Sequence, residues 1–227
     1  MRPHFSMPRI GVPADVAAIR LALAAALNIK CDNGRKVGDS KYGVYAFYDF
    51  DGEPIYVGQT TEKLRVRIRR HLTNHRTDAV AMNVLDPFEV YDIEMWPFWD
   101  MQGLPSPKIA KRLDAAEYTV FEKLLAASTY TAVLNEKDMP KSATVKLPSS
   151  VRACIIPEEL RESRKHPDVR IARRAGTIAS LAKVISERDV SPGLRRTLHT
   201  QSRRLERLAA IRYAEFAGDP VETESEE

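Results

Sequence analysis

Hydrophobic residues recur at helical spacing in three stretches of the chain. Between residues 13 and 30 the apolar positions lie three or four apart, which predicts a helix, and Asn33-Gly34 follows as a stop signal. Residues 64–75 place apolar side chains on one helical face, and residues 108–127 repeat this pattern. We therefore expect three helices, separated by stretches of a different period.

Those intervening stretches are typical of β-strands. Residues 42–50 are rich in aromatic and β-branched side chains, Asp51-Gly52 is a strong signal for a two-residue turn, and residues 54–58 follow as the return strand. Alternation over residues 88–96 predicts a third strand. The order helix, strand, strand, helix, strand, helix predicts an α+β domain with a short mixed or antiparallel three-stranded sheet flanked by helices.

The rest of the chain predicts a linker and more helices. Two long basic helices are expected over residues 168–188 and 192–216, and Pro and Ser residues near 141–150 are typical of a linker. We therefore divide the chain into an N-terminal helical extension at 1–40, the α+β domain at 41–140, the linker at 141–150, a basic helical region at 151–216 and an acidic disordered tail at 217–227.

Composition narrows the class of protein. The 227 residues are 44% hydrophobic and 29% charged, which is normal for a globular domain. The longest apolar stretch, Leu21 to Leu27, is too short to cross a bilayer, and Arg20 interrupts a possible export signal, so we expect no membrane partner. Two cysteines without close spacing fit a reducing, cytoplasmic setting. No nucleotide cofactor is expected.

The charge distribution points to a polyanionic partner. The chain has 35 Lys and Arg against 31 Asp and Glu, a net charge of +4. Five of the acids lie in the last eleven residues, whereas residues 151–216 hold 15 basic and 8 acidic residues. A basic helical region beside a compact domain fits nucleic acid, although such a run is also typical of a solvated surface.

The hairpin brings two tyrosines together. A two-residue turn at Asp51-Gly52 places Tyr45 opposite Gly58. Tyr56 then points to the same face of the sheet and is a diagonal neighbour of Tyr45, with the space above Gly58 left open. The alternative interpretation is an aromatic hairpin that packs on a helix.

The residues after the hairpin give this pair a context. Gly43-Val44-Tyr45 and Tyr56-Val57-Gly58 resemble the two triplets of the GIY-YIG nuclease family, with the tyrosines eleven positions apart. The sequence Leu64-Arg65-Val66-Arg67-Ile68-Arg69-Arg70-His71-Leu72 resembles the helix of that family, in which an arginine three residues after a leucine carries the catalytic charge. The resemblance covers residues 42–137 and implies a metal-dependent endonuclease that acts on DNA, with RNA left open.

The resemblance also implies site residues. Tyr45 or Tyr56 would deprotonate the attacking water, with a slight preference for Tyr45, and Arg67 would hold the scissile phosphate. A tyrosine with its ordinary pKa of about 10 needs a nearby positive charge for that role. His71 would orient a tyrosine or shuttle a proton, or else be a semi-buried structural histidine. Gly43, Gly58 and a closing asparagine, Asn135, would support the site.

A carboxylate is needed for the metal. Glu117 lies within the apolar stripe of the predicted helix 108–127, where an unpaired carboxylate is costly, and we expect it to bind Mg²⁺ or Mn²⁺. Glu122 is the alternative, because it lies 13 positions before Asn135, closer to the spacing of compact family members. His71 and His75 have the spacing of a zinc pair but lack further ligands.

Two departures from the family pattern leave a second function open. Gln59 stands where family members often have a lysine, and Glu117 precedes Asn135 by 18 positions, which is longer than usual. The alternative is a nucleic-acid-binding module of the same fold that cleaves nothing. In either case we expect nucleic acid to contact nine arginines: Arg65, Arg69, Arg70, Arg173, Arg174, Arg195, Arg196, Arg203 and Arg204.

Overall fold

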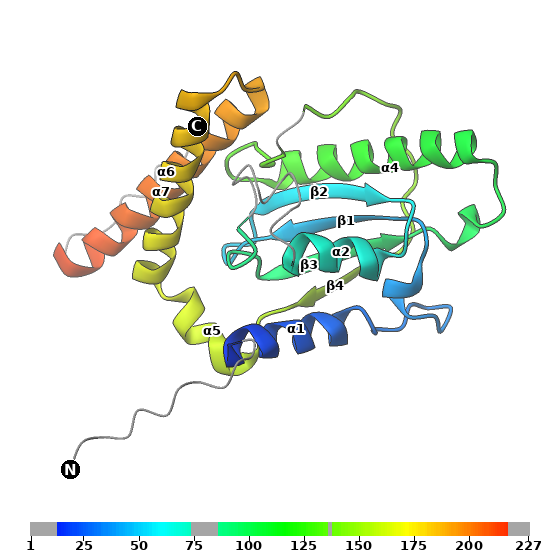
Figure 1. The fold of residues 1–227 in the computed structure, drawn as a ribbon, viewed down its shortest axis with the longest axis horizontal. Helices are drawn as coiled ribbons and strands as arrows, with labels where there is room; N and C mark the ends of the chain where they lie inside the picture. Colours follow the sequence, from blue (N-terminus) through cyan, green and yellow to red (C-terminus); the bar gives the residue numbers. More distant parts are fainter. Residues whose placement is uncertain (1–12, 74–85, 136–137, 218–227) are drawn as a thin grey trace, which may run out of the picture.

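The computed structural model describes residues 13–73, 86–135 and 138–217. Four strands and six labelled helices build the described part of the chain (Figure 1). Their bounds are α1 Ala14–Ala26, β1 Gly43–Tyr48, β2 Pro54–Thr60, α2 Leu64–Thr73, β3 Asp92–Pro97, α4 Ser106–Ala127, β4 Val151–Cys154, α5 Glu158–Lys165, α6 Pro167–Glu187 and α7 Pro192–Ala217, with short 3-10 turns at Val37–Asp39 and Trp99–Met101.

The sheet has four strands in the order β2-β1-β3-β4, and every neighbouring pair is antiparallel. The α+β class is therefore confirmed, but the expectation of three strands was wrong. The fourth strand is β4, which begins the region predicted to be helical and pairs with residues 92–95 of β3. Four residues with an arginine among them carry too little pattern to signal a strand, and only the pairing with β3 defines it.

The β1–β2 hairpin has the expected register near its centre, where Tyr45 lies opposite Gly58. Its turn is longer than the predicted two residues, because the register shifts between Phe47 and Tyr48. The Asp49 carboxylate causes this change: Oδ1 accepts hydrogen bonds from the backbone N–H groups of Asp51 and Glu53, at 2.9 and 3.0 Å. Hydrogen bonds to the Asp49 side chain thus take the place of backbone pairing between the two strands at the end of the hairpin.

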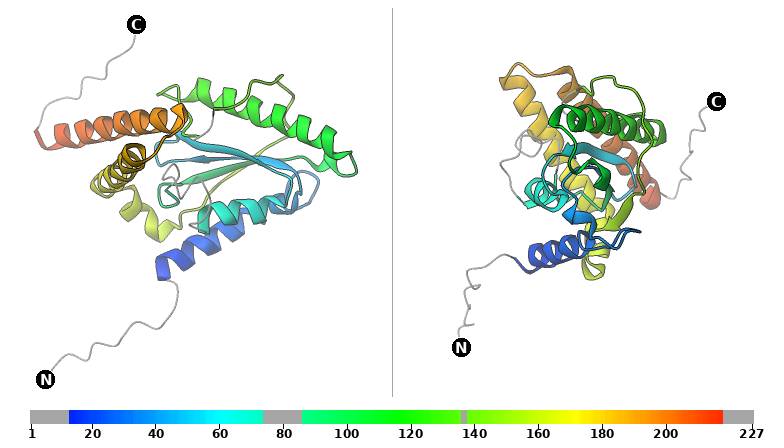
Figure 2. Two further views of the ribbon diagram at one scale, coloured as in Figure 1. Left: turned by 45° about the horizontal axis from the view of Figure 1, so that its top comes forward. Right: turned by 90° about the vertical axis from the view of Figure 1, so that its right-hand side faces the viewer.

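Helices cover both faces of the sheet and form two cores (Figures 1 and 2). On one face α4 packs Leu113, Ala116 and Val120 against Val44 and Val57 of the hairpin, among other residues. The opposite face carries α1 and α2, whose Leu23, Leu64 and Ile68 pack against side chains that include Tyr45 and Phe47. Alternate residues of β1 therefore belong to different cores, as the period of a strand requires.

Helices α6 and α7 lie side by side at one end of the sheet (Figure 1). They are fixed to the hairpin turn by buried ion pairs: Arg174 lies 2.8 Å and Arg204 3.6 Å from the Asp49 carboxylate, and all three side chains are almost fully enclosed. Arg170 forms a further pair with Asp51. The expectation that Arg174 and Arg204 contact nucleic acid was therefore wrong, since their guanidinium groups are used inside the protein.

Two elements begin or end at residues other than those predicted, because hydrogen bonds to neighbouring segments intervene. The first helix ends four residues earlier than predicted, because Ile29 and Leu27 accept backbone hydrogen bonds from residues 37 and 38. The third strand begins four residues later, since Asp86 Oδ1 accepts from the Phe88 N–H in a local turn.

Residues 141–150 have no helix or strand, but they are tied to the domain. The Val145 N–H donates to Thr119 on α4 at 2.9 Å, and the Ser150 hydroxyl donates to Glu94 on β3 at 2.7 Å. The division of the chain into domains stays a prediction, and the acidic tail beyond residue 217 lies outside the described residues. In the part of the chain that the structure describes, no helix is long and apolar enough to span a membrane.

Candidate active site

The two tyrosines meet beside a glycine at the edge of the sheet. The ring centroids of Tyr45 and Tyr56 are 6.2 Å apart, which confirms the predicted diagonal pair. A Cβ built on Gly58 would lie 2.7 Å from the Tyr45 hydroxyl oxygen and 2.7 Å from Tyr56 Cε1. Only glycine therefore leaves room for both phenols at this place.

Helix α2 brings a guanidinium to the same pair. Gly43 permits the close approach of the helix, because a Cβ there would lie within 3 Å of the Leu64 side chain. One turn further on, Arg67 Nε donates to the Tyr45 hydroxyl at 3.4 Å. Arg67 is half-buried, so its guanidinium contacts the phenols and still reaches solvent.

His71 occupies the next turn of α2 and is buried among aromatic rings. Its ring centroid lies 5.2 Å from that of Tyr56 and 5.9 Å from that of Tyr45, and Phe47 is 6.3 Å away. The histidine is thus enclosed beside the tyrosine pair. His75, the other histidine of the predicted zinc pair, lies outside the described residues.

Glu117 approaches from α4, on the other side of the edge strand. Its pKa is raised to about 7, chiefly by burial and also by the negative charge of Asp114, although hydrogen bonds to Gln59 and the positive charge of Arg67 oppose the rise. The Gln59 side chain also donates to Asp114 Oδ1 at 2.6 Å. Gln59, at the position of the expected lysine, therefore links two carboxylates of α4 to β2.

The alternative carboxylate, Glu122, is exposed and lies five positions along α4. Five residues turn a helix by about 140° from Glu117. The structure thus brings Glu117 to the tyrosines and leaves Glu122 away from them. Asp114 is a residue that the sequence analysis missed, and its signal was its position one turn before Glu117 on the same helix.

Asn135 fixes the edge strand from outside. Its side chain pairs with the backbone of Val57 as another strand would: Oδ1 accepts from the Val57 N–H at 3.0 Å, and Nδ2 donates to the Val57 carbonyl at 2.8 Å. Val57 lies between Tyr56 and Gly58. The buried amide therefore holds the segment that carries the second tyrosine.

Both phenols are harder to ionise than an exposed tyrosine. Burial raises the pKa of Tyr45 well above its ordinary value, and the neighbouring Tyr56 adds to this, while Arg67 opposes it. Burial likewise raises the pKa of Tyr56, against the charge of Arg67 and a hydrogen bond from Tyr45. The arginine alone does not offset the loss of hydration at either hydroxyl.

The described residues contain no cluster of three or more His, Cys, Asp or Glu side chains that could hold a metal ion. A cation at Glu117 would therefore take most of its ligands from water and substrate oxygen. Mg²⁺ binds in this way, since it keeps several waters and uses one or two carboxylates. The oxygen donors of Glu117 and nearby Asp114 fit such an ion.

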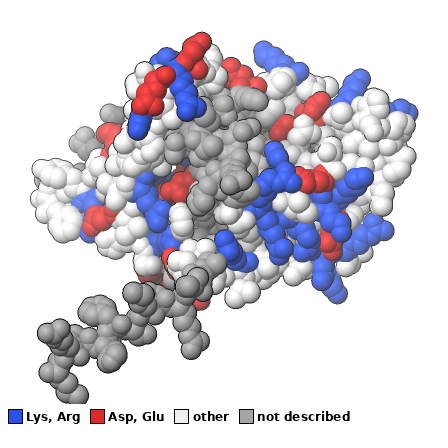
Figure 3. All heavy atoms as spheres, in the orientation of Figure 1, with Lys and Arg blue, Asp and Glu red and all other residues white. Residues whose placement is uncertain are grey.

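The other predicted arginines divide into two groups. Arg65, Arg70, Arg173 and Arg196 form ion pairs with Asp39, Glu62, Asp86 and Asp138, at 2.9, 2.7, 3.5 and 2.8 Å. Arg69 on α2 and Arg195 and Arg203 on α7 are exposed. Figure 3 shows Lys and Arg side chains gathered over α2 and the segment before β1. The exposed Lys41 lies before β1 and the exposed Lys63 lies immediately before α2, and neither was predicted.

Two tyrosines, an arginine and a glutamate thus lie together at one edge of a small α+β domain. Residues 41–126 match the family model described as the GIY-YIG catalytic domain, which confirms the resemblance over this part of the chain. No curated protein and no solved structure matches the chain significantly.

Proposed function

We propose that this protein is a metal-dependent endonuclease that hydrolyses phosphodiester bonds of DNA. The observation that carries the proposal is the convergence of Tyr45, Tyr56, Arg67 and Glu117, with the two phenols packed against Gly58. Hydrolysis needs an activated water, positive charge at the phosphoryl oxygens and help for the leaving group. The site offers a chemical group for each of these needs.

Arg67 is the proposed phosphate ligand. A guanidinium can donate to two phosphate oxygens at once, and the half-buried position of Arg67 strengthens that interaction. The tyrosine pair is the proposed base. We favour Tyr45 because Arg67 donates to its hydroxyl and stabilises a phenolate there. His71, enclosed by both rings, is proposed to position them.

Glu117 is the proposed ligand of Mg²⁺ or Mn²⁺. When bound, the cation would lower the pKa of a water or phenol and neutralise charge on the phosphate. Glu117 needs such a partner, because its burial disfavours the ionised carboxylate. Gln59 would link β2 to α4 through its hydrogen bond to Asp114. Asn135 would hold the edge of β2 through its hydrogen bond to the Val57 backbone.

Exposed cations would guide the nucleic acid. Arg69 on α2 lies close in sequence to Arg67, and Arg195 and Arg203 extend the positive surface along α7. Contacts of this kind bind phosphates without reading sequence. We propose that DNA lies across α2, where Lys and Arg side chains gather in Figure 3, with α7 as a second contact.

The test is cleavage of supercoiled and linear plasmid with Mg²⁺, with Mn²⁺ and with EDTA. Wild type should cut only with a metal ion, and Tyr45→Phe, Arg67→Ala and Glu117→Ala should each lose the cutting. Glu122→Ala is the matched control, since it removes an exposed carboxylate of the same helix. Equal loss in the control, or cutting in EDTA, would contradict the proposed site.

The alternative is a module that binds nucleic acid without cutting it. The raised pKa of both tyrosines favours this reading, because a phenol that stays protonated cannot act as the base. In that case no variant changes plasmid integrity, while gel-shift binding remains. Cleavage of RNA but not of DNA would support the proposed active site and would show that RNA, and not DNA, is the substrate.

A further inference from the structure

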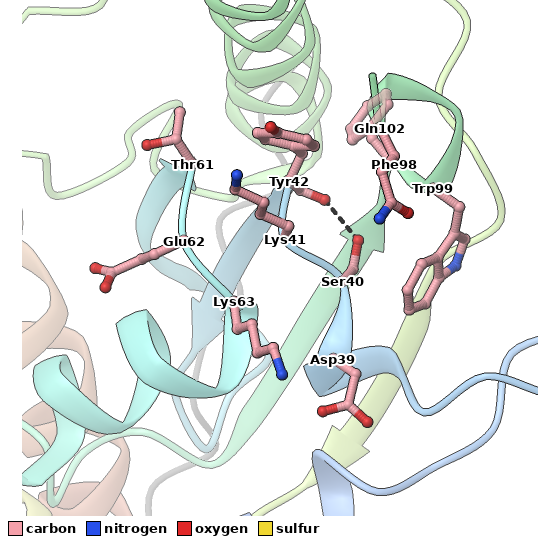
Figure 4. A pocket seen from close by; sticks show the side chains of 10 residues that line it. All are labelled: Asp39, Ser40, Lys41, Tyr42, Thr61, Glu62, Lys63, Phe98, Trp99 and Gln102. Carbon is pink, nitrogen blue, oxygen red and sulfur yellow. Dashed lines mark hydrogen bonds between the residues drawn. The ribbon is translucent and has the colours of Figure 1, made fainter. Parts of the chain in front are cut away.

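A cavity of about 410 Å³ lies at the end of the sheet next to α2 (Figure 4). Three segments line it: residues 39–42 before β1, residues 61–63 between β2 and α2, and residues 98–102 after β3. The last two segments, and residues 41–42 of the first, lie within the GIY-YIG match, but none of these side chains belongs to the proposed catalytic group.

Backbone hydrogen bonds fix the walls of this cavity. The Leu64 N–H donates to the Ser40 carbonyl at 2.9 Å, which ties α2 to the segment before β1. The Phe98 N–H donates to the Tyr42 carbonyl at 2.9 Å, and the Ser40 hydroxyl donates to the same carbonyl at 2.8 Å. The cavity is therefore formed before any ligand binds.

The cavity has two positive charges that acids within the described structure do not neutralise. Its acidic residues are already paired: Asp39 binds Arg65 at 2.9 Å, and Glu62 binds Arg70 at 2.7 Å. Lys41 and Lys63 are exposed and form no ion pair with any described residue, and the Lys41 amine lies 5.4 Å from the centre of the Tyr42 ring. A ligand in this cavity would meet a net positive charge, which favours an anion.

Aromatic surface adjoins these charges. Tyr42, Phe98 and Trp99 contribute rings to the lining, and Trp99 is only half-buried, with the Arg35 guanidinium 5.3 Å from the centre of its ring. Figure 4 shows the Gln102 amide on the same side of the cavity as Trp99, across from Thr61 and Glu62. Cations, stacking surface and an amide together suit a nucleotide, because the base stacks on rings and the phosphate binds amines.

The cavity is continuous with the proposed active site along two elements. Lys63 lies immediately before α2 and precedes Arg67 by four residues, so the two positions are about 6 Å apart along the helix axis. Tyr42 precedes Tyr45 by three residues on the way into β1. When Arg67 holds a phosphate of a DNA strand, the neighbouring nucleotide of that strand is therefore within reach of the cavity.

We propose that this cavity binds the nucleotide next to the scissile phosphate, with its base against Trp99 and its phosphate at Lys41 and Lys63. This assignment rests on the proposed endonuclease function, and it adds a subsite that determines how the strand lies across the site. A nucleotide held here is unstacked from its neighbour, so the subsite favours single-stranded or distorted DNA over a regular duplex.

The first experiment titrates the full chain with dAMP in EDTA and records tryptophan fluorescence. The other tryptophan, Trp96, is almost fully buried in the core, so quenching reports on Trp99. Saturable quenching is expected in wild type, and the double variant Lys41→Gln/Lys63→Gln should bind at least about tenfold more weakly. Lys108→Gln/Lys111→Gln removes two exposed lysines of α4 and should bind dAMP as wild type does. No saturable quenching in wild type, or equal quenching in both double variants, would overturn the proposal.

The second experiment separates a substrate nucleotide from a free one. With a single-stranded oligonucleotide as substrate, the Lys41→Gln/Lys63→Gln variant should show a KM at least about tenfold above that of wild type. If wild type cuts DNA and this variant has an unchanged KM, the substrate subsite is refuted while the endonuclease stands. If wild type cuts nothing, the endonuclease proposal fails, and with it the substrate subsite, while dAMP binding still reports whether the cavity takes nucleotides.

Discussion

Replacing Gly58 by alanine tests whether the space beside the tyrosine pair is required. The new methyl group would lie 2.7 Å from the Tyr45 hydroxyl oxygen, 2.7 Å from Tyr56 Cε1 and 2.9 Å from Tyr45 Cζ. Carbon atoms prefer separations of about 3.5–4.0 Å, so the phenols must move by about 1 Å. Tyr45 is fully buried, so its ring cannot shift without moving neighbouring side chains.

Two effects should follow, and their sizes differ. Overpacking of a dense core costs about 1–3 kcal/mol of unfolding free energy, so we expect Gly58→Ala to remain folded but less stable. A catalytic group displaced by about 1 Å can slow a reaction by about 100-fold, so cleavage should fall far more than stability. The double variant Gly58→Ala/Tyr45→Phe should regain part of the lost stability, because it removes the nearest oxygen.

The assays are urea denaturation and the rate of plasmid cleavage in Mg²⁺. Gly176→Ala is the matched control: its added Cβ meets no atom within 4 Å and lies in the interior of α6. This control should gain about 0.5–1 kcal/mol and cut as wild type does. A Gly58→Ala protein with wild-type stability and cleavage rate would refute the argument that the phenols need this space.

Three further changes test other parts of the molecule. Burial raises the pKa of Glu89 from 4.5 to about 7, so the native carboxyl keeps its proton there while the unfolded one loses it. The free energy of unfolding should thus fall by about 3 kcal/mol as pH rises from 4.5 to 7. In urea melts at pH 5 and pH 8, Glu89→Gln should lose less stability between the two pH values than wild type does. An equal loss in both proteins would contradict this prediction. Arg174→Met leaves Asp49 buried without its closest partner and should cost about 3–5 kcal/mol in the same melts, with unchanged DNA affinity in gel shifts. Asn135→Ala removes both hydrogen bonds to Val57 and should cost about 2–4 kcal/mol, and a loss below 0.5 kcal/mol would show that the edge is held otherwise.

The site was predictable because its members are close in sequence or lie on elements of clear period. Strand alternation and one turn signal placed Tyr45 opposite Gly58, and the error in turn length did not reach that pair. Helical period placed Arg67 and His71 on the helix that follows. Glu117 was found because a carboxylate within an apolar stripe contradicts its surroundings unless it has a partner.

The role of the C-terminal arginines could not be read from the chain. Arg174 and Arg204 look like surface cations in a basic helical segment, and their acidic partner lies 125 and 155 positions away at Asp49. Helical spacing gives the face of a residue but not what that face packs against. Charge counts therefore overstated the surface available to nucleic acid, since several of the positive charges hold α6 and α7 to the hairpin.

The sequence by itself determined the α+β class, the hairpin register at Tyr45 and the match of residues 41–126 to the GIY-YIG family model, because local period and short motifs carry that information. Only the tertiary structure decided that Val151–Cys154 completes the sheet, that Glu117 and not Glu122 faces the tyrosines, and that Arg174 is internal. Each of these depends on which distant segments meet. That meeting is set by burial and pairing summed over the whole fold, and no window of the sequence contains it.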